Sequence, residues 1–314
     1  FIMSFDRLIE KIVEKQNPTV AGLDPKLAYI PEYIKEESFK KYGKTLEGAA
    51  DAILTYNKGL IDELYDIVPA VKPQCAYYEM YGWYGVRALA ETIKYAKSKG
   101  MFVITDGKRN DIGTTMEAYA IAHLGETDID GETEEAFGGD ALTVNGYLGS
   151  DGINPLITIC EEKDKGIFVL VKTSNPSSGE LQNLEFRGEE TVYLHMGRMC
   201  EDWGKKVVGK YGYSGVGAVV GATYPEMLTE LRGELPKTFF LVPGYGAQGG
   251  GANDCKGAFD QNGIGAIVNS SRGIMCAWQK IEGLDEKDYA KAARQEAIRM
   301  RDDLKSVIGE MKLK

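Results

Sequence analysis

Eight short apolar runs, spaced along a chain of 314 residues, constrain the fold of this protein more than any other feature of its sequence. The runs are rich in β-branched residues and carry few polar ones, which is typical of strands buried on both faces. Such strands belong mostly to parallel sheets that helices cover. The eight predicted strands span residues 19–23, 69–71, 102–105, 141–144, 167–171, 216–220, 239–242 and 266–268.

Helical patterns separate these runs, so that strand and helix alternate eight times. This alternation predicts a (β/α)8 TIM barrel, and a doubly wound open sheet is the alternative. No linker or low-complexity segment divides the chain, so we expect a single barrel domain over residues 1–314 that ends in an amphipathic helix at 286–308. The other predicted helices span 4–15, 46–67, 85–98, 114–124, 154–162, 189–211, 225–231 and 255–261.

The net charge of −10 at pH 7 and the pI of about 5.0 disfavour binding to nucleic acid or to an anionic membrane. An anionic substrate must therefore be held by local cations. We expect no membrane span and no signal peptide, because no apolar run is long enough. The five cysteines are scattered and form no Cys-x-x-Cys pair, which argues against a disulfide framework and favours a reducing cytoplasm.

Polar residues follow the predicted strands, and the carboxyl ends of barrel strands are where such folds carry their chemistry. Because these ends meet at one rim, we expect the residues to lie near one another. They are Asp24 after the first strand, Lys72 after the second, Asp106, Lys108 and Asp111 after the third, Asn145 after the fourth, Ser174 after the fifth, and Ser271 and Arg272 after the eighth.

The segment after strand 102–105 is the most specific of these signals. Asp106 and Lys108 are two residues apart, so in extended backbone both side chains point to one side, and Asp111 follows three residues later. A lysine between carboxylates can deliver a proton to a carbon atom. An ordinary surface ion pair after a strand is the alternative interpretation.

A glycine-rich loop at residues 244–251 follows strand 239–242 and predicts a phosphate site. Gly244, Gly246 and Gly249 have the spacing of a dinucleotide fingerprint, but the next strand does not end in the acidic residue that would bind a ribose. Backbone N–H groups of such a loop can surround an anion, and Arg272 can form a paired contact with it. A merely flexible loop is the alternative.

Other chemistries find little support in the sequence. The two histidines, His123 and His195, fall in predicted helices, so a Ser-His-Asp or Cys-His site is not expected. Clustered His and Cys metal ligands are absent from the sequence, although Asp106 and Asp111 could hold magnesium. We interpret residues 126–135 as a solvated acidic loop, since the ligand spacing of a calcium loop is incomplete.

These residues resemble the orotidine 5′-phosphate decarboxylase family, and the resemblance covers nearly the whole predicted barrel. The long chain, the Lys72-Pro-Gln motif and the Val268-Asn-Ser-Ser-Arg272-Gly motif are similar to the longer subgroup of that family. Gly146 and Asn110 depart from its pattern, which has proline and glycine there. The motifs are Leu23-Asp24-Pro25, Lys72, Asp106-x-Lys108-x-x-Asp111-Ile112, Pro243-Gly-x-Gly-Ala-Gln248-Gly-Gly and Ser271-Arg272.

The resemblance implies decarboxylation of orotidine 5′-phosphate to uridine 5′-phosphate in pyrimidine biosynthesis, with no metal or other cofactor, by a homodimer. Asp106 would lie against the substrate carboxylate, and Lys108 would stabilise and protonate the carbanion at C6. Asp111 would be donated across the dimer interface. In this scheme Asp24, Lys72 and Thr115 hold ribose hydroxyls, Ser174 reads the pyrimidine, Gln248 and Arg272 hold the phosphate, and Asn145, Gly246 and Ser271 complete the binding set.

Two other functions stay open. Magnesium-dependent sugar-phosphate decarboxylases or aldolases of the same barrel type share the Asp-x-Lys-x-x-Asp element, but there we expect glutamate at the position of Lys72. A regulatory barrel that binds a nucleotide without turnover is the non-enzyme alternative.

Overall fold

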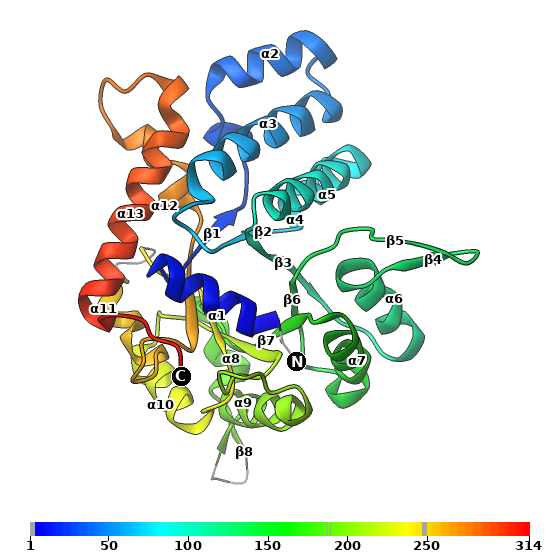
Figure 1. Cartoon of the computed structure of the whole chain (residues 1–314), viewed down its shortest axis with the longest axis vertical. Coiled ribbons are helices and arrows are strands. Elements are labelled where there is room, and N and C mark those ends of the chain that lie inside the picture. Colours follow the sequence, from blue (N-terminus) through cyan, green and yellow to red (C-terminus); the bar gives the residue numbers. More distant parts are fainter. Residues whose placement is uncertain (1–3, 187, 189, 247–249) are drawn as a thin grey trace.

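Eight parallel strands close into a barrel in the computed structural model, which describes residues 4–186, 188, 190–246 and 250–314 (Figure 1). Neighbouring strands follow the order β1-β12-β11-β10-β7-β6-β3-β2 around the barrel. This closed barrel confirms the predicted (β/α)8 fold and excludes the open sheet. The barrel strands are β1 (Thr19–Leu23), β2 (Ala70–Pro73), β3 (Phe102–Arg109), β6 (Ala141–Val144), β7 (Gly166–Lys172), β10 (Val216–Val220), β11 (Phe240–Val242) and β12 (Ala266–Ser270).

Helices surround the strands, and their apolar faces form a continuous layer of buried side chains with the outer face of the barrel. The longer helices are α2 (Glu32–Tyr42), α3 (Leu46–Leu64), α5 (Gly82–Ser98), α6 (Gly113–Leu124), α7 (Asn154–Lys163), α9 (Val192–Trp203), α10 (Pro225–Glu234) and α13 (Tyr289–Ile308). Four single-turn helices lie in the connections: α4 (Ala76–Glu79), α8 (Gly179–Gln182), α11 (Ala252–Cys255) and α12 (Arg272–Met275).

The first helix, α1 (Ser4–Lys15), closes the end of the barrel where the strands begin (Figure 1). Phe5 is fully buried, and its ring centre lies 4.8 Å from that of Phe168 and 5.4 Å from that of Phe239. A Cβ atom on Gly166 would come within 2.6 Å of the Phe5 ring, so glycine is required at that contact. With this end filled, the opposite rim, at the carboxyl ends of the strands, is left for a binding site.

Two predicted helices are wrong in extent. The helix expected at 189–211 is α9, which ends at Trp203, where Gly204 begins a short 3-10 turn. The helix expected at 255–261 is absent, because the single turn α11 is followed only by a 3-10 turn, Lys256–Ala258. The Asp260 carboxylate accepts backbone N–H groups of Asn262 and Ile264, and such side-chain bonds favour a turn over a helix.

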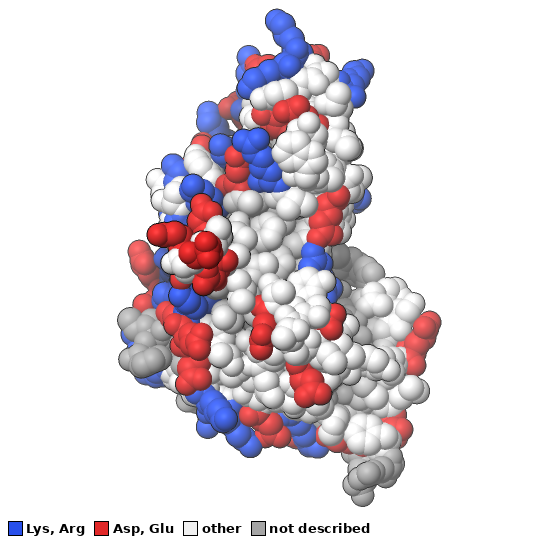
Figure 2. All heavy atoms as spheres, turned by 90° about the vertical axis from the view of Figure 1, so that its right-hand side faces the viewer, with Lys and Arg blue, Asp and Glu red and all other residues white. Residues whose placement is uncertain are grey.

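The acidic segment 126–135, expected to be a solvated loop, is exposed and forms a hairpin. Strands β4 (Thr127–Ile129) and β5 (Glu132–Glu134) pair antiparallel around Asp130 and Gly131, which both have positive φ, as Asp-Gly hairpin turns require. The hairpin projects from the barrel, and Figure 2, which views this side, shows a dense group of acidic side chains there. A second small hairpin pairs β8 (Glu185–Phe186) with β9 (Glu190–Thr191).

Candidate active site

The carboxylate of Asp106 lies between two lysines at the open rim of the barrel. Lys72 Nζ lies 2.8 Å from Asp106 Oδ2, and Lys108 Nζ lies 2.8 Å from Asp106 Oδ1. The Lys72 side chain is 6% exposed and that of Asp106 is 9% exposed, whereas that of Lys108 is 45% exposed. The buried pair therefore anchors the array, and Lys108 is its most accessible member.

Strand β3 is irregular where it carries this array. The pairing of β3 with β6 shifts register between Thr105 and Arg109, and Lys108 has a φ of +49°, in the left-handed region that lysine rarely adopts. The prediction that Asp106 and Lys108 point to one side is confirmed by their ion pair, although the backbone between them is not regular strand. Backbone strain of this kind, of about 1–3 kcal/mol, is found mainly at functional sites.

The charges in the array reinforce one another. Burial alone would raise the pKa of Asp106, but Lys72 and Lys108 outweigh it and hold that pKa well below its usual range. Burial alone would lower the pKa of Lys72, but the carboxylates of Asp106 and Asp24 outweigh it and raise that pKa. The Asp106 carboxylate and the Lys72 ammonium group are therefore both charged at neutral pH.

Asp24 lies beside this array at the end of β1. One of its carboxylate oxygens, Oδ1, is buried and has no hydrogen-bond partner among the described residues. The backbone before it is fixed, because the buried Tyr78 hydroxyl donates to the Leu23 carbonyl, 3.1 Å away, and accepts a bond from Asn57. A buried, unsatisfied carboxylate oxygen on a fixed backbone can accept a ligand hydroxyl.

A cavity of about 370 Å³ opens over the array. Three charged residues line it together with apolar and uncharged polar side chains, a combination typical of small-molecule sites. Ser174, predicted to read a pyrimidine, lies in its wall. The lining residues are Lys72, Asp106, Lys108, Thr143, Leu170, Thr173, Ser174, Asn175, Val219, Leu241 and Pro243.

A second pocket, of about 780 Å³, adjoins the first along the chain, since Pro243 lines one and Gly244 the other. It contains Arg272 and Gly246 of the predicted phosphate site and the predicted substrate-binding residue Ser271, and the Arg272 side chain is exposed. Gln248, also predicted to hold phosphate, lies outside the described residues. The pocket therefore brings together the described part of the predicted phosphate site.

Three predicted site residues lie away from both pockets of this chain. Asp111 accepts a hydrogen bond from the Ile112 backbone N–H, 2.8 Å away, and makes no ion pair with Lys108. Thr115 is exposed on the first turn of α6, and Asn145 is exposed and bonds to the Tyr147 backbone. A single chain therefore assembles Lys72, Asp106 and Lys108 but not Asp111.

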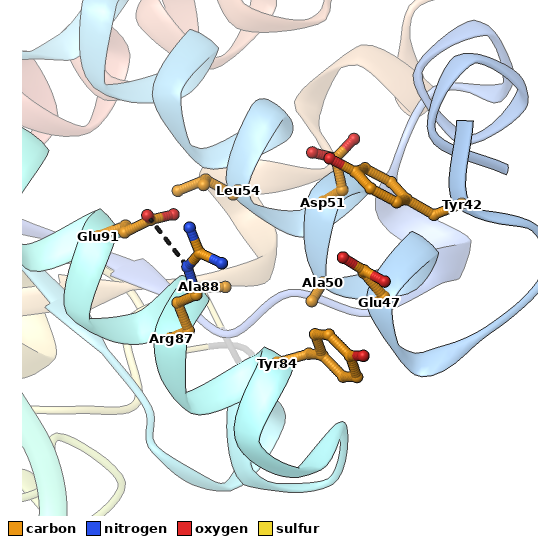
Figure 3. Close-up of a pocket in the computed structure, with 9 residues that line it drawn as sticks. All are labelled: Tyr42, Glu47, Ala50, Asp51, Leu54, Tyr84, Arg87, Ala88 and Glu91. Atoms are coloured by element: carbon orange, nitrogen blue, oxygen red, sulfur yellow. Dashed lines mark hydrogen bonds and ion pairs between the residues drawn. The ribbon is translucent and has the colours of Figure 1, made fainter. Parts of the chain in front are cut away.

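The remaining candidates elsewhere carry less chemistry. A pocket of about 100 Å³ between α2, α3 and α5 holds Glu47, Asp51, Glu91 and Arg87, with Arg87 bonded to Glu91 (Figure 3). His123 is buried and stacks on Phe137, and His195 bonds to Glu190, so both histidines are packed or surface residues as predicted. Among the described residues no three His, Cys, Asp or Glu side chains are grouped to hold a metal ion, and no described helix could cross a membrane.

Comparison with known proteins identifies the family. The family model described as "Orotidine 5′-phosphate decarboxylase / HUMPS family" matches residues 50–284. The chain belongs to this family. Orotidine 5′-phosphate decarboxylase of Rhodopirellula baltica is 43% identical over 297 residues, 94% of this chain and 96% of that protein. The enzyme of the same name from Clostridium tetani is 42% identical over 306 residues, 98% of this chain and 99% of that protein.

The fold comparison agrees with the sequence comparison. The structure of Leishmania donovani OMP decarboxylase superimposes with a TM-score of 0.71 at 29% identity, covering 96% of this chain and 99% of that chain. The resemblance inferred from the motifs is therefore confirmed at the level of the orotidine 5′-phosphate decarboxylase family. Its relatives of that name are carboxy-lyases, and this chain is an enzyme of their class.

Thr143 is a residue of this decarboxylase-family site that the sequence reasoning missed. Its hydroxyl donates a hydrogen bond to Asp106 Oδ1 at 2.7 Å and accepts one from the Lys108 backbone N–H at 3.0 Å. A threonine in an apolar run looks like an ordinary strand residue. The available signal was its alternation with the inward-facing Ala141, which places Thr143 inside the barrel next to β3.

Proposed function

We propose that this protein converts orotidine 5′-phosphate into uridine 5′-phosphate and carbon dioxide in pyrimidine biosynthesis, without a metal ion or other cofactor. The observation that carries the proposal is the buried array of Lys72, Asp106 and Lys108 at the base of the cavity. Family membership supplies the substrate, since the relatives at about 40% identity carry the name of this reaction.

The chemistry follows from the charges. The bond from C6 to the carboxylate breaks, carbon dioxide leaves, and the electron pair remains on C6. Lys108, the solvent-accessible member of the array, stabilises this carbanion as an ammonium group and then transfers a proton to C6. Asp106, held as an anion, faces the substrate carboxylate and repels it until it departs as a neutral molecule.

The remaining residues divide the nucleotide between the two pockets. Leu170, Val219 and Leu241 pack against the flat pyrimidine, and Ser174 reads its edge. Asp24 and Lys72 hold the ribose, while Ser271, Arg272 and the loop at Gly246 hold the phosphate, with Gln248. Thr115, expected at the ribose, and Asn145 lie outside both pockets of this chain, so in this proposal they complete the binding set from a second chain. Phosphate binding far from the reacting bond supplies energy that a preorganised site can use in the transition state.

We also propose that the protein is a homodimer whose sites are shared, with Asp111 of each chain completing the site of the other. The support is that large apolar side chains stay exposed in the segments after β2, β3 and β6, the same side of the rim. These are Met80 and Trp83, both 65% exposed, Ile112, Tyr147 and Leu148. Apolar side chains gathered in this way favour a protein interface. The five free, buried cysteines support a reducing, cytoplasmic compartment.

One assay tests the function. The absorbance of orotidine 5′-phosphate is followed with and without EDTA, and we expect its loss in both. Loss of activity in EDTA favours the magnesium-dependent sugar-phosphate enzymes, which are then tested on their own substrates. Tight binding of uridine 5′-phosphate with no turnover of orotidine 5′-phosphate favours the regulatory barrel.

A further inference from the structure

Tyr245 connects the glycine-rich segment to the last helix of the protein. Its side chain is buried, and its hydroxyl donates a hydrogen bond to Asp303 Oδ2 on α13, 2.6 Å away. Arg299, one turn earlier on α13, donates to the same hydroxyl at 3.5 Å and is itself bonded to Glu296. Helix α13 runs alongside α11 and α12, which follow the two strands that carry the phosphate pocket (Figure 1).

The backbone around Tyr245 has little conformational restraint of its own. Gly244 has a φ of +101° and Gly246 a φ of +73°, both in the region that glycine favours. The Gly246 N–H donates to the Gly250 carbonyl at 2.7 Å, which joins the two ends of the glycine-rich loop. We call residues 244–246 the neck of this loop. Tyr245 is the residue between Gly244 and Gly246, so the bond from its side chain to Asp303 determines how this neck is oriented.

The bond between Tyr245 and Asp303 is chemically suited to holding the backbone of residues 244–246 in place. Burial raises the pKa of Tyr245 to about 12, with a further contribution from the bond to Asp303, so the phenol keeps its proton and remains a donor. A hydrogen bond from a neutral hydroxyl to a carboxylate is stronger and more directional than one between neutral groups. Gly244, Gly246 and Arg272 line the same pocket, together with two further cations, Lys280 and Arg299, so the glycine backbone and Arg272 face the same space.

We propose that Tyr245 is a positioning residue, whose bond to Asp303 fixes residues 244–246 against α13 so that the Gly246 backbone and Arg272 face the 5′-phosphate together. The proposal rests on the proposed function for the identity of the ligand. It assigns to the C-terminal helix a role in phosphate affinity, beyond packing against the barrel.

The test measures binding by calorimetry, with uridine 5′-phosphate, uridine and inorganic phosphate as probes. Tyr245→Phe keeps the ring and removes the hydroxyl. We expect this variant to bind uridine 5′-phosphate about tenfold more weakly, a loss of about 1.4 kcal/mol in binding free energy. The affinity for inorganic phosphate should fall by a similar factor, and the affinity for uridine should change less than about twofold. Asp303→Ala should reproduce this pattern, and the double variant should be no weaker than either single one, because both remove one bond. Asp303→Asn keeps an acceptor and should restore most of the affinity.

Tyr213→Phe is the matched control. The Tyr213 hydroxyl also donates to a carboxylate, Asp260, at 2.8 Å, but it lies before β10 at the opposite end of the barrel. Tyr213→Phe should lower the thermal stability about as much as Tyr245→Phe does and should leave the affinities for all three probes unchanged. The proposal would be overturned if Tyr245→Phe lowered the affinities for uridine and uridine 5′-phosphate equally, or if it lowered neither. Because binding does not need turnover, a phosphate-selective loss in a protein that fails to decarboxylate would uphold Tyr245 and refute the proposed function alone.

Discussion

Thr143 donates a hydrogen bond across neighbouring strands to Asp106, the carboxylate that two lysines already hold. The same hydroxyl accepts from the Lys108 backbone, so one side chain fixes the positions of both the anion and the proton donor. Thr143→Val keeps the shape and removes both bonds. Hydrogen bonds to charged groups contribute about 1.5–3 kcal/mol, so we expect kcat/KM for orotidine 5′-phosphate to fall about thirtyfold.

Thr143→Ser is the control for this variant, since it keeps the hydroxyl and loses only the methyl group. Steady-state kinetics should show activity within about threefold of the wild type, a change of less than about 1 kcal/mol. A valine variant as active as the serine variant would mean that the bond to Asp106 does not contribute to catalysis.

Lys108→Ala tests the proton donor. The variant removes the accessible cation of the array, so we expect turnover to fall by several orders of magnitude while circular dichroism shows an intact fold. Lys163→Ala is the control, because Lys163 is also a half-exposed lysine paired with a carboxylate, that of Glu126. Retention of more than about a tenth of the wild-type kcat, a loss of only about 1.4 kcal/mol, would exclude Lys108 as the donor.

Arg272→Ala tests the phosphate pocket. Loss of a charged contact in a binding site costs about 2–5 kcal/mol, so we expect a large fall in kcat/KM for the nucleotide and little change for orotidine itself. Arg87→Ala, on the outer helix α5, is the control and should change neither. Equal losses with both substrates would indicate that Arg272 supports the structure and does not hold phosphate.

The stability of the protein should depend on Asp106 at low pH. The pKa of Asp106 is lowered on folding, so the stability that its charge contributes is present above the unfolded pKa of about 3.9 and is lost as the pH falls toward the folded value. Urea unfolding of the wild type and of Asp106→Asn should therefore show a difference in unfolding free energy that is constant near pH 6–7 and shrinks below about pH 4. A difference that stays constant down to pH 2.5 would contradict this assignment.

The sequence predicted the barrel well and the site only in part, for physical reasons. Buried parallel strands leave a direct signal, because both faces must be apolar, so runs such as 216–220 matched strand bounds closely. Helix α2 was not predicted, because only Ile34 and Ser38 are buried in it and its sequence therefore carries no clear apolar pattern. Thr143 was missed because its function depends on a neighbouring strand that is distant in sequence. Asp111 has a local spacing that suggests contact with Lys108, yet the turn into α6 carries it away within one chain.

The separation of Asp111 from Lys108 leads to the prediction for the dimer. If each site combines Asp106 and Lys108 of one chain with Asp111 of the other, Lys108→Ala and Asp111→Ala homodimers should both be nearly inactive. Equal amounts that are dissociated and reassembled give dimers of which about half are mixed. One site of each mixed dimer lacks both residues and the other is intact, so about a quarter of the wild-type activity should return.

Subunit exchange must be measured independently of activity, and native mass spectrometry of a mass-labelled pair does this. Lys108→Ala mixed with Asp106→Ala is the matched control, because both substitutions then lie on the same side of each shared site. Every site in that mixture lacks one residue of the pair from its own chain, so no activity should return after the same exchange. Confirmed exchange without recovery in the Asp111 mixture would place Asp111 outside the partner's site, and the apolar surface around Trp83 and Tyr147 would then need another explanation.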